Sequence, residues 1–369
     1  MHNTVFVVTN LFTFVEKLES MNWHEIFMFG GFLVIITFFL FLDIGIFNKE
    51  NKPVSFKSAL LWTIVWVSLA LIFWGMIYFF GDRIHSPQNM EELQNLVARY
   101  GHPIKLIESD FEASLLLYRQ NLGLEFITGY LIEYSLSVDN IFVILMIFYS
   151  FNLQKKYYHK VLFWGILGAV VMRFLFIFIS AALIQKFSWL LYGFGALLVI
   201  TGIKMFLDRN HESHIDTARH PIIRFVEKYF RVDKTDNSGQ FFVTIDHKIH
   251  ITTLFIVLLV VEFSDVIFAV DSIPAIFSVT LDPYIVYFSN IFAIIGLRSL
   301  FFLVENIVQR FWFLKIGLSI LLAFIGTKML IHSFYAMPTL QSLIIILAIL
   351  SGSVLISILF PKKNDLISS

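Results

Sequence analysis

The chain has no cysteine among its 369 residues, which excludes disulfides and the thiolate ligands of copper(I), structural zinc and iron–sulfur clusters. Charge is also scarce, since charged residues make up 15% of the chain and hydrophobic residues 58%. Water-soluble domains of this length do not normally show that balance, so lipid must surround most of the chain. The formal net charge is zero and gives no sign of a nucleic-acid partner. Because the chain has no thiolate, any bound metal must be held by oxygen or imidazole.

Long apolar runs fill most of the sequence. Crossing about 30 Å of hydrocarbon takes about 20 apolar residues, and nine candidate spans follow one another along the chain. They cover residues 26–47, 59–80, 122–149, 161–183, 188–207, 251–279, 284–305, 312–333 and 340–360. Two polar segments interrupt them: residues 81–121 are acidic, with a helix-start signal at Ser86-Pro87, and residues 208–250 are basic. The sequence predicts an all-α polytopic membrane protein with about nine transmembrane helices.

The distribution of Lys and Arg predicts the orientation in the membrane. The segments on one side of the nine spans carry seventeen basic residues, and those on the other side carry six. Basic residues collect on the cytoplasmic side. We therefore expect the N-terminus and residues 81–121 outside, with residues 208–250 and the C-terminus in the cytoplasm.

An internal repeat relates two parts of the chain. Asp139-Asn140-Ile141 corresponds to Asp271-Ser272-Ile273, Arg173 to Arg298, and Gly202-Ile203-Lys204-Met205 to Gly326-Thr327-Lys328-Met329, with offsets of 124 to 132 residues. Each copy contains three spans, an odd number, so the two copies must lie in opposite orientations. Inverted repeats of this kind are typical of secondary transporters, whose sites lie near the bilayer midplane.

The repeat divides the chain into five predicted parts. Residues 1–121 hold two spans and the acidic external loop, 122–207 form the first three-helix repeat (spans 3–5), and 208–250 form the basic cytoplasmic loop. Residues 251–333 form the second repeat (spans 6–8), and 334–369 hold the last span and the tail.

Acidic side chains gather at the start of each repeat. The string EYSLSVDNIF carries Glu133, Asp139 and Asn140, the string EFSDVIFAVDSIPA carries Glu262, Asp265, Asp271 and Ser272, and the first span carries Asp43. A charge at the bilayer centre costs at least about 2.5–3.5 kcal/mol on insertion scales. Arg173 and Arg298 are the basic residues deep in the spans, so two positive charges oppose six carboxylates. Bound cations, protons or both must balance the difference.

These residues predict a cation site built from oxygen ligands. The predicted ligands are Asp43, Glu133, Asp139, Asn140, Glu262, Asp265, Asp271 and Ser272. Such a set suits manganese, magnesium or calcium better than copper or zinc. Residues six apart on a helix point about 120° away from each other, so these carboxylates do not all face one ion. Pro274 should kink or unwind its span and free backbone carbonyls as further ligands, whereas the two arginines are interpreted as framework.

The same strings resemble the TerC family of membrane proteins. The resemblance rests on E-x-x-L-S-x-D-N from Glu133 to Asn140 and on D-x-x-F-A-x-D-S-I-P-A from Asp265 to Ala275. The family is associated with tellurite resistance and, in its alkali-inducible members, with manganese export. The resemblance implies a bacterial inner-membrane protein that exports manganese or a similar ion, with the matching acids as ligands.

The sequence carries no P-loop, G-x-S-x-G or H-E-x-x-H string, so we expect neither an enzyme nor a prosthetic group. A proton or sodium gradient would have to drive export. Three alternatives remain open at this point. One is a passive cation channel, and another is a membrane scaffold, assembly or tellurite-stress protein without transport. The third is an intramembrane aspartyl protease, although the expected G-x-G-D signature is missing.

Overall fold

The computed structural model describes residues 30–32, 34–36, 38–39, 55–187, 189–207, 230–233, 239–245, 248–307, 313–331, 334–335 and 337–360. Six described helices are long and apolar enough to cross a membrane. They are α3 (Phe56–Phe80), α5 (Phe111–Ser150), α6 (Tyr158–Lys186), α7 (Leu190–Leu207), α9 (Thr253–Phe277) and α13 (Thr339–Leu359). Two helices bent by 42° at Gly296, α10 (Pro283–Ile295) and α11 (Leu297–Ile307), make a further span when counted together. In α12 (Leu314–Ile331) the apolar helical stretch, Ile316–Ile331, is shorter than in these helices.

This architecture confirms the predicted fold class, a polytopic all-α membrane protein. Every predicted span from 59–80 to 340–360 falls on one of these helices or on the bent pair. Of the first predicted span, 26–47, residues 30–32, 34–36 and 38–39 are described, and all eight are helical. The count of nine spans therefore stays a prediction.

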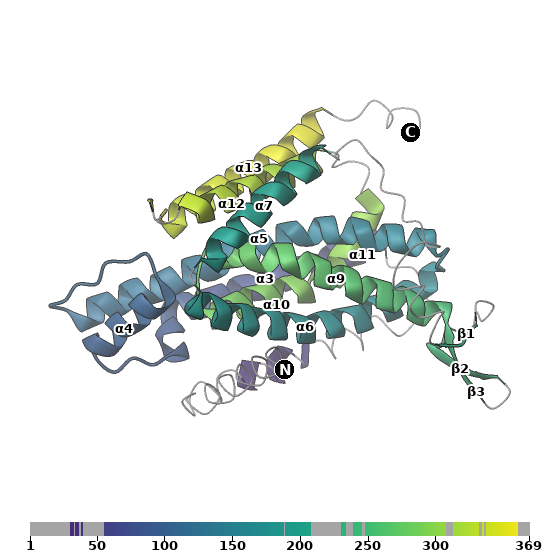
Figure 1. Ribbon diagram of the computed structural model, residues 1–369, viewed down its shortest axis with the longest axis horizontal. Coiled ribbons are helices and arrows are strands. Elements are labelled where there is room, and N and C mark those ends of the chain that lie inside the picture. Colours follow the sequence, from purple (N-terminus) through teal and green to yellow (C-terminus); the bar gives the residue numbers. More distant parts are fainter. Residues whose placement is uncertain are drawn as a thin grey trace, which may run out of the picture.

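A small polar structure lies at one end of the bundle, at the left of Figure 1. It contains the 3-10 helix η1 (Gly81–Ile84) and the helix α4 (Met90–Tyr100). The predicted helix start at Ser86-Pro87 was wrong, because the Asn89 side chain accepts a hydrogen bond from the Glu92 amide at 2.9 Å and α4 begins at Met90. Asn side chains are favoured at this position for that reason. Since α5 begins at Phe111, its first turns belong to the same polar end.

A three-stranded sheet lies at the opposite end (Figure 1). Its order is β1-β3-β2, in which β1 (Val232–Asp233) pairs parallel with β3 (Lys248–Thr252), and β2 (Phe242–Ile245) pairs antiparallel with β3. Lys160 Nζ donates to the Gly239 carbonyl at 2.8 Å and ties this region to α6. The sequence did not predict the sheet. The segment 81–121 and the described residues of 208–250, which were predicted on opposite sides of the membrane, lie at opposite ends of the bundle (Figure 1).

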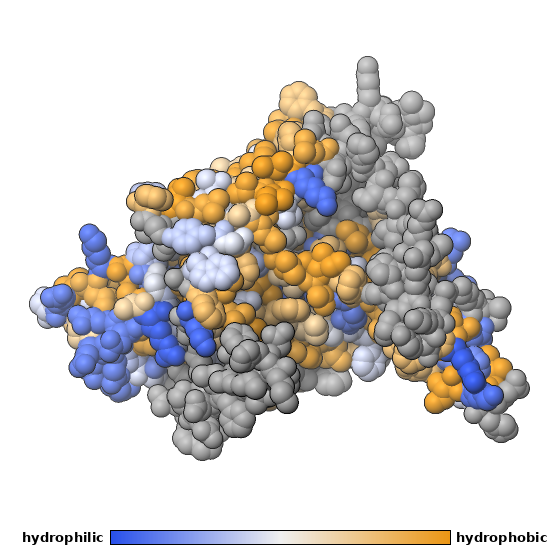
Figure 2. Space-filling view, viewed as in Figure 1, coloured by the Kyte–Doolittle hydropathy of each residue, from blue (hydrophilic) through white to orange (hydrophobic). Residues whose placement is uncertain are grey.

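Between these ends the helices present an apolar surface. The buried residues of α3 are Ala59, Thr63, Trp66, Ala70 and Ile77, and their spacing places them on one helix face. The other faces keep large apolar side chains outside, such as Leu61 at 60% and Ile72 at 61% exposure. Figure 2 shows hydrophobic side chains across the middle of the molecule, hydrophilic ones gathered at the α4 end, and a mixture of both at the sheet end. Such a surface is stable only in lipid.

The centre of the bundle is α10, whose thirteen residues are all buried. It packs against α5 and α6, and α9 packs against both of these helices. A Cβ atom at Gly129 of α5 would lie 2.8 Å from Ser289 Oγ of α10 and 3.1 Å from Ile276 of α9. Glycine at this position therefore allows three helices to meet about one turn from Glu133.

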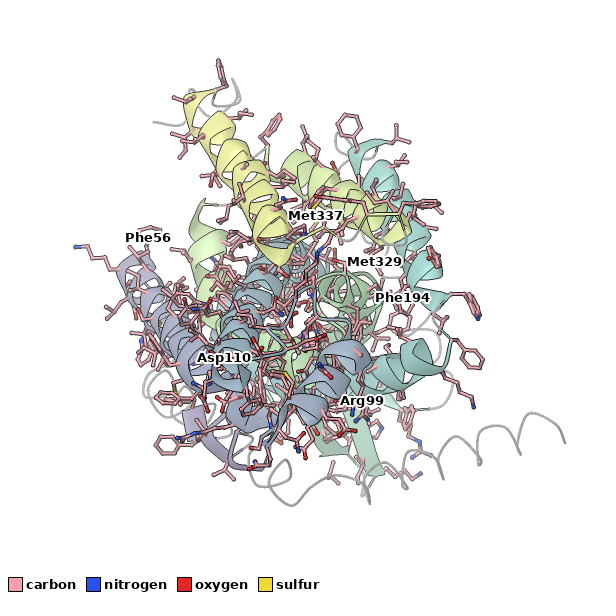
Figure 3. The ribbon with its side chains drawn as sticks, turned by 90° about the vertical axis from the view of Figure 1, so that its left-hand side faces the viewer. Phe56, Arg99, Asp110, Phe194, Met329 and Met337 are labelled. Carbon is pink, nitrogen blue, oxygen red and sulfur yellow. The ribbon has the colours of Figure 1, made fainter. Side chains whose placement is uncertain are left out.

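A second layer, formed by α7, α12 and α13, covers one side of this core (Figures 1 and 3). Figure 3 labels Phe194 of α7 and Met329 of α12 within it. A Cβ atom at Gly326 would lie 2.6 Å from the Gly195 carbonyl oxygen, and one at Gly202 would lie 2.8 Å from the Ser319 carbonyl oxygen. These contacts show that α7 and α12 run antiparallel in close backbone contact. Inverted repeats require this of equivalent helices, and the repeat itself stays a prediction.

The predicted unwinding at Pro274 was wrong. The helix α9 continues through Pro274 and ends at Phe277. A proline removes one intrahelical hydrogen bond, while the side chains around it, Ile273, Ala275 and Ile276, are at most 2% exposed. Packing of this last turn against the core holds the helix together.

Candidate cation site

Four helices bring polar side chains together inside the apolar core. Glu133 comes from α5, Arg173 from α6, Asp265 and Ser272 from α9, and Asn290 from α10. Because α5 and α9 lie side by side in antiparallel orientation, Glu133 and Asp265 reach the same guanidinium from different helices. These two acids are also counterparts in the predicted repeat.

Arg173 is the hub of this cluster. Its Nη1 donates to Glu133 Oε1 and also to Ser272 Oγ at 3.2 Å. Its Nη2 donates to Asp265 Oδ1 at 3.4 Å. The other oxygen of Glu133 accepts a hydrogen bond from Asn290 Nδ2 at 3.2 Å. One guanidinium thus bridges two carboxylates that come from different parts of the chain.

The cluster is incomplete as a set of ion pairs. Asp265 Oδ2, Asn290 Oδ1 and Arg173 Nε are buried without a hydrogen-bond partner. Two carboxylates face one guanidinium, so their charges do not cancel when both acids are ionised. Buried polar groups are normally paired, and a buried charge without a partner is costly. Two free acceptor oxygens beside a net negative charge are what a cation requires.

Glu262 lies near this cluster on the same helix. It stands three residues before Asp265, so the two acids lie on neighbouring positions of one face of α9. Its carboxylate rests against the backbone of α6, where a Cβ atom at Gly168 would lie 2.1 Å from Glu262 Oε1. Glycine at position 168 therefore leaves the space that the carboxylate occupies.

The structure tests the other predicted ligands only in part. Asn140 is buried, at 7% exposure, and lies on α5 seven residues after Glu133. The side chains of Asp139 and Asp271 lie outside the described part of the structure, and so does Asp43. Among the described side chains, no three or more His, Asp or Glu residues are grouped so that they could hold a metal ion. The structure brings Glu133, Asp265 and Ser272 together around Arg173, with Glu262 close to Asp265.

A second buried polar cluster lies at the end of the bundle that carries α4. His85 Nε2 lies 2.9 Å from Asp282 Oδ2, and His102 Nδ1 lies 2.8 Å from Glu125 Oε1. Asn121 Nδ2 donates to the same Glu125 oxygen at 2.7 Å. We call these five residues the end cluster. The four charged partners have side chains no more than 1% exposed, so the end cluster fastens residues 81–110 to α5 and to the turn between α9 and α10.

Two pKa values reflect the pairing in the end cluster. Burial by itself would lower the pKa of His102, but the charge and hydrogen bond of Glu125 outweigh burial and raise it above its usual value. Burial by itself would raise the pKa of Asp282, but the charge and hydrogen bond of His85 outweigh burial and lower it. Both shifts favour the charged forms.

The comparison with protein families decides which family this fold and site belong to. The family described as "Integral membrane protein TerC family" matches residues 118–365, which include every residue of the candidate cation site from Glu133 to Asn290. The chain belongs to the TerC family. The match begins within α5, so all of residues 81–117 lie outside it.

Relatives of this TerC protein align over almost its whole length. A Myxococcus xanthus protein named "Uncharacterized membrane protein STKORF319" is 41% identical over 90% of this chain and 92% of its own. A Salmonella typhi protein named "Putative membrane-bound redox modulator Alx" is 40% identical over 92% of this chain and 96% of its own. A Rickettsia bellii protein named "Uncharacterized membrane protein" is 37% identical over 90% and 97%. No solved structure matches the chain.

Sequence reasoning missed several polar residues of this TerC protein. Asn290 was not singled out, although it stands with Ser289 in an otherwise apolar helix. Glu125 lies within the predicted span 122–149 and was not counted among its acids. Both had a visible signal, a polar residue in an apolar run. Lys328 lies in the last turn of α12, where it is 5% exposed and donates to Ser342 Oγ at 3.2 Å.

Proposed function

We propose that this protein is a transporter that exports a divalent metal cation through the site around Glu133 and Asp265. Among the divalent cations, we propose Mn²⁺ as the substrate. One observation carries the proposal. Two carboxylates from α5 and α9 converge within the apolar core on a single guanidinium. One oxygen of these carboxylates, Asp265 Oδ2, and the neighbouring amide oxygen, Asn290 Oδ1, lack hydrogen-bond partners. Intramembrane ionisable residues that face the interior of a bundle mark ion pathways.

The chemistry of the ligands favours a hard cation. Carboxylate, amide and hydroxyl oxygens suit Mn²⁺, Mg²⁺ and Ca²⁺, and the site offers these groups from Glu133, Asp265, Asn290 and Ser272. The family resemblance favours manganese among them. The printed name of the Salmonella relative speaks of redox modulation, but this chain has no cysteine to carry a thiol-based redox role.

We further propose that export is coupled to inward movement of protons by alternating access. The carboxylates outnumber the guanidinium, so the ion-free site needs positive charge that protons supply and a metal replaces. The predicted inverted repeat is the architecture that alternating access commonly uses. In a bacterial inner membrane the α4 end would face outward and the sheet end would face the cytoplasm.

The decisive experiment is metal flux into proteoliposomes across a panel of Mn²⁺, Mg²⁺, Ca²⁺, Co²⁺ and Zn²⁺, with a pH-sensitive dye inside the vesicles. We expect Mn²⁺ movement opposed by proton movement. Metal flux without proton movement, which only follows the metal gradient, would indicate a channel. No flux of any of these ions through folded protein would favour a scaffold.

The same assay locates the site. Glu133→Gln, Asp265→Asn, Asp139→Asn and Asp271→Asn should each abolish flux and leave the protein folded and inserted, since each keeps size and removes charge. Asp82→Asn is the control, because Asp82 pairs with Arg119 at the α4 end, outside the site. Equal loss of flux in the control, or misfolding of all four variants, would show that these acids are structural.

Cysteine labelling tests the orientation, because the native chain has no cysteine. Asn95→Cys on α4 and Thr244→Cys in β2 place single thiols at exposed positions on opposite ends. We expect an impermeant reagent to label position 95 from outside and position 244 from the cytoplasm. The reverse result would invert the proposed direction of the chain and contradict the charge rule that predicted it.

A further inference from the structure

Arg173 occupies an unusual position for a residue that would only hold helices together. It is 1% exposed and touches three groups of the site, Glu133, Asp265 and Ser272. A guanidinium keeps its charge in proteins. It is therefore a permanent cation placed between the two carboxylates that the proposed function assigns to the transported ion.

The oxygens involved leave little room for both cations. Arg173 takes one oxygen of Glu133 and one of Asp265, and Asn290 takes the second oxygen of Glu133. A metal ion bound by both acids needs oxygens from each of them. Asp265 Oδ2 and Asn290 Oδ1 are the buried acceptors still free here, so a metal held by both carboxylates must displace either the Asn290 amide from Glu133 Oε2 or a bond from the guanidinium. In either case the positive charge of the guanidinium opposes the metal at the same two acids.

We propose that Arg173 is a built-in competitor of the transported cation: in the ion-free protein its guanidinium occupies the place between Glu133 and Asp265 that a divalent cation takes during transport. This inference rests on the proposed function. In the ion-free site the guanidinium pairs with the carboxylates. In the metal-bound site it competes with the metal for the same carboxylates and so promotes release of the metal.

The competitor also sets selectivity for ionic charge. A monovalent ion that displaced the guanidinium would bring the same charge to the carboxylates and gain little Coulomb energy. A divalent ion brings one charge more, which matters where the effective dielectric constant is low. Arg173 is thus a specificity residue that excludes Na⁺ and K⁺ in favour of divalent ions.

A structural ion pair would look different. Its charges would balance, even where single atoms lack a hydrogen-bond partner, as Glu125 Oε2 and His102 Nε2 do in the end cluster. Here the guanidinium Nε, one oxygen of Asp265 and the amide oxygen of Asn290 are unpartnered, and two carboxylates share one positive charge.

The test measures Mn²⁺ binding to the purified full-length protein in choline chloride and in NaCl at equal ionic strength and one pH. The wild type should bind Mn²⁺ with the same Kd in both salts. Arg173→Gln should bind Mn²⁺ about tenfold more tightly or better in choline chloride, export it more slowly, and lose several-fold of its affinity in NaCl. Arg173→Lys keeps a competing charge and should stay within about threefold of the wild type. Arg119→Gln, which removes an arginine paired with a carboxylate outside the site, should behave as wild type.

A structure of the wild-type protein with Mn²⁺ bound gives a second measurement that needs no variant to fold. We expect the bond from Arg173 to Glu133 or to Asp265 to be broken and the metal to lie between these acids. An intact guanidinium bridge with metal bound elsewhere would overturn the proposal. The proposal would also be overturned if the wild type transports Mn²⁺ and Arg173→Gln shows the same Kd and the same salt response as the wild type. In that case the proposed function would stand. A wild type that neither binds nor moves Mn²⁺ would overturn both.

Discussion

The protein buries two polar clusters that differ in how their charges are balanced. In the end cluster, two histidines face two carboxylates one to one, His85 with Asp282 and His102 with Glu125. In the cation site, Glu133 and Asp265 share Arg173. When its histidines are protonated the end cluster is neutral by itself, whereas the cation site keeps an excess of negative charge.

The two clusters also join different kinds of elements. The end cluster connects the polar residues 81–110 to the helices, so its partners fasten an extramembrane segment to the bundle. The cation site joins four helices within the apolar core. The balanced cluster is thus suited to hold structure, and the unbalanced one is suited to bind an ion. Each prediction below tests this distinction, starting with the largest expected effect.

The first prediction compares one acid from each cluster. Glu133→Gln should lower Mn²⁺ flux by about 100-fold or more, because it removes a charge that the ion needs in a low-dielectric site. Glu125→Gln should leave flux within about threefold and destabilise the protein by about 1–3 kcal/mol, because it weakens a buried hydrogen-bonded pair. Flux in proteoliposomes and thermal unfolding in detergent provide the two readouts. Equal loss of flux in both variants would show that the two clusters do not differ in their importance for transport.

The second prediction concerns the space beside Glu262. Gly168→Ala would place a Cβ atom 2.1 Å from Glu262 Oε1 and must move that carboxylate. We expect flux to fall about tenfold, as in Glu262→Gln, and the double variant to be no worse than either single one because both changes act on one group.

Gly165→Ala is the matched control on the same helix, since its Cβ atom would lie an ordinary 3.4 Å from Val261. If Gly168→Ala transports normally, then Glu262 does not belong to the site.

The third prediction concerns how the stability contributed by the end cluster depends on pH. The raised pKa of His102 means that its contribution to stability is complete below about pH 6.5, the unperturbed value, and is lost as pH rises through the higher folded-state value. The lowered pKa of Asp282 means that its contribution is present above its unfolded value and lost as pH falls through the folded value. The segment should be most stable between these two pKa values.

Hydrogen–deuterium exchange of the α4 amides measures this stability. Comparison with His102→Asn at each pH removes the intrinsic pH dependence of exchange. The ratio of the exchange rates of His102→Asn and the wild type should be largest at mildly acidic pH and should fall as pH rises. The total fall should be about tenfold for each unit by which the His102 pKa is raised. A difference that does not change with pH would mean that His102 acts without its charge.

The fourth prediction has the smallest effect. Ser272→Ala removes a neutral acceptor 3.2 Å from Arg173 Nη1 and leaves every charge in place. Removal of one such hydrogen bond costs about 0.5–1.5 kcal/mol, so the Mn²⁺ Kd should change by less than about tenfold. A loss of flux as complete as that of Glu133→Gln would instead mean that the Ser272 hydroxyl is as necessary to the site as a carboxylate.

The sequence predicted the fold class because apolar runs longer than about 20 residues have few stable alternatives to helices in lipid. It also predicted that Glu133 and Asp265 matter, since acids are costly in such runs. It did not predict the helix start at Met90, because the cap at Asn89 competes with the Ser86-Pro87 signal and local geometry decides between them. The sheet was missed because its strands are only two to five residues long.

By itself, the sequence determined that the chain lies in a membrane and where its polar segments interrupt the helices, and it predicted that acids such as Glu133 and Asp265 need compensation inside. Tertiary structure alone decided that Glu133 and Asp265 meet at Arg173, that Asn290 joins them, and that Glu125 pairs with His102. The reason is physical: helices in lipid are apolar on nearly every side, so their sequences give little periodic signal of the face that turns inward. Close packing between helices, as at Gly129 and Gly168, selects that face and with it the partners of each buried charge.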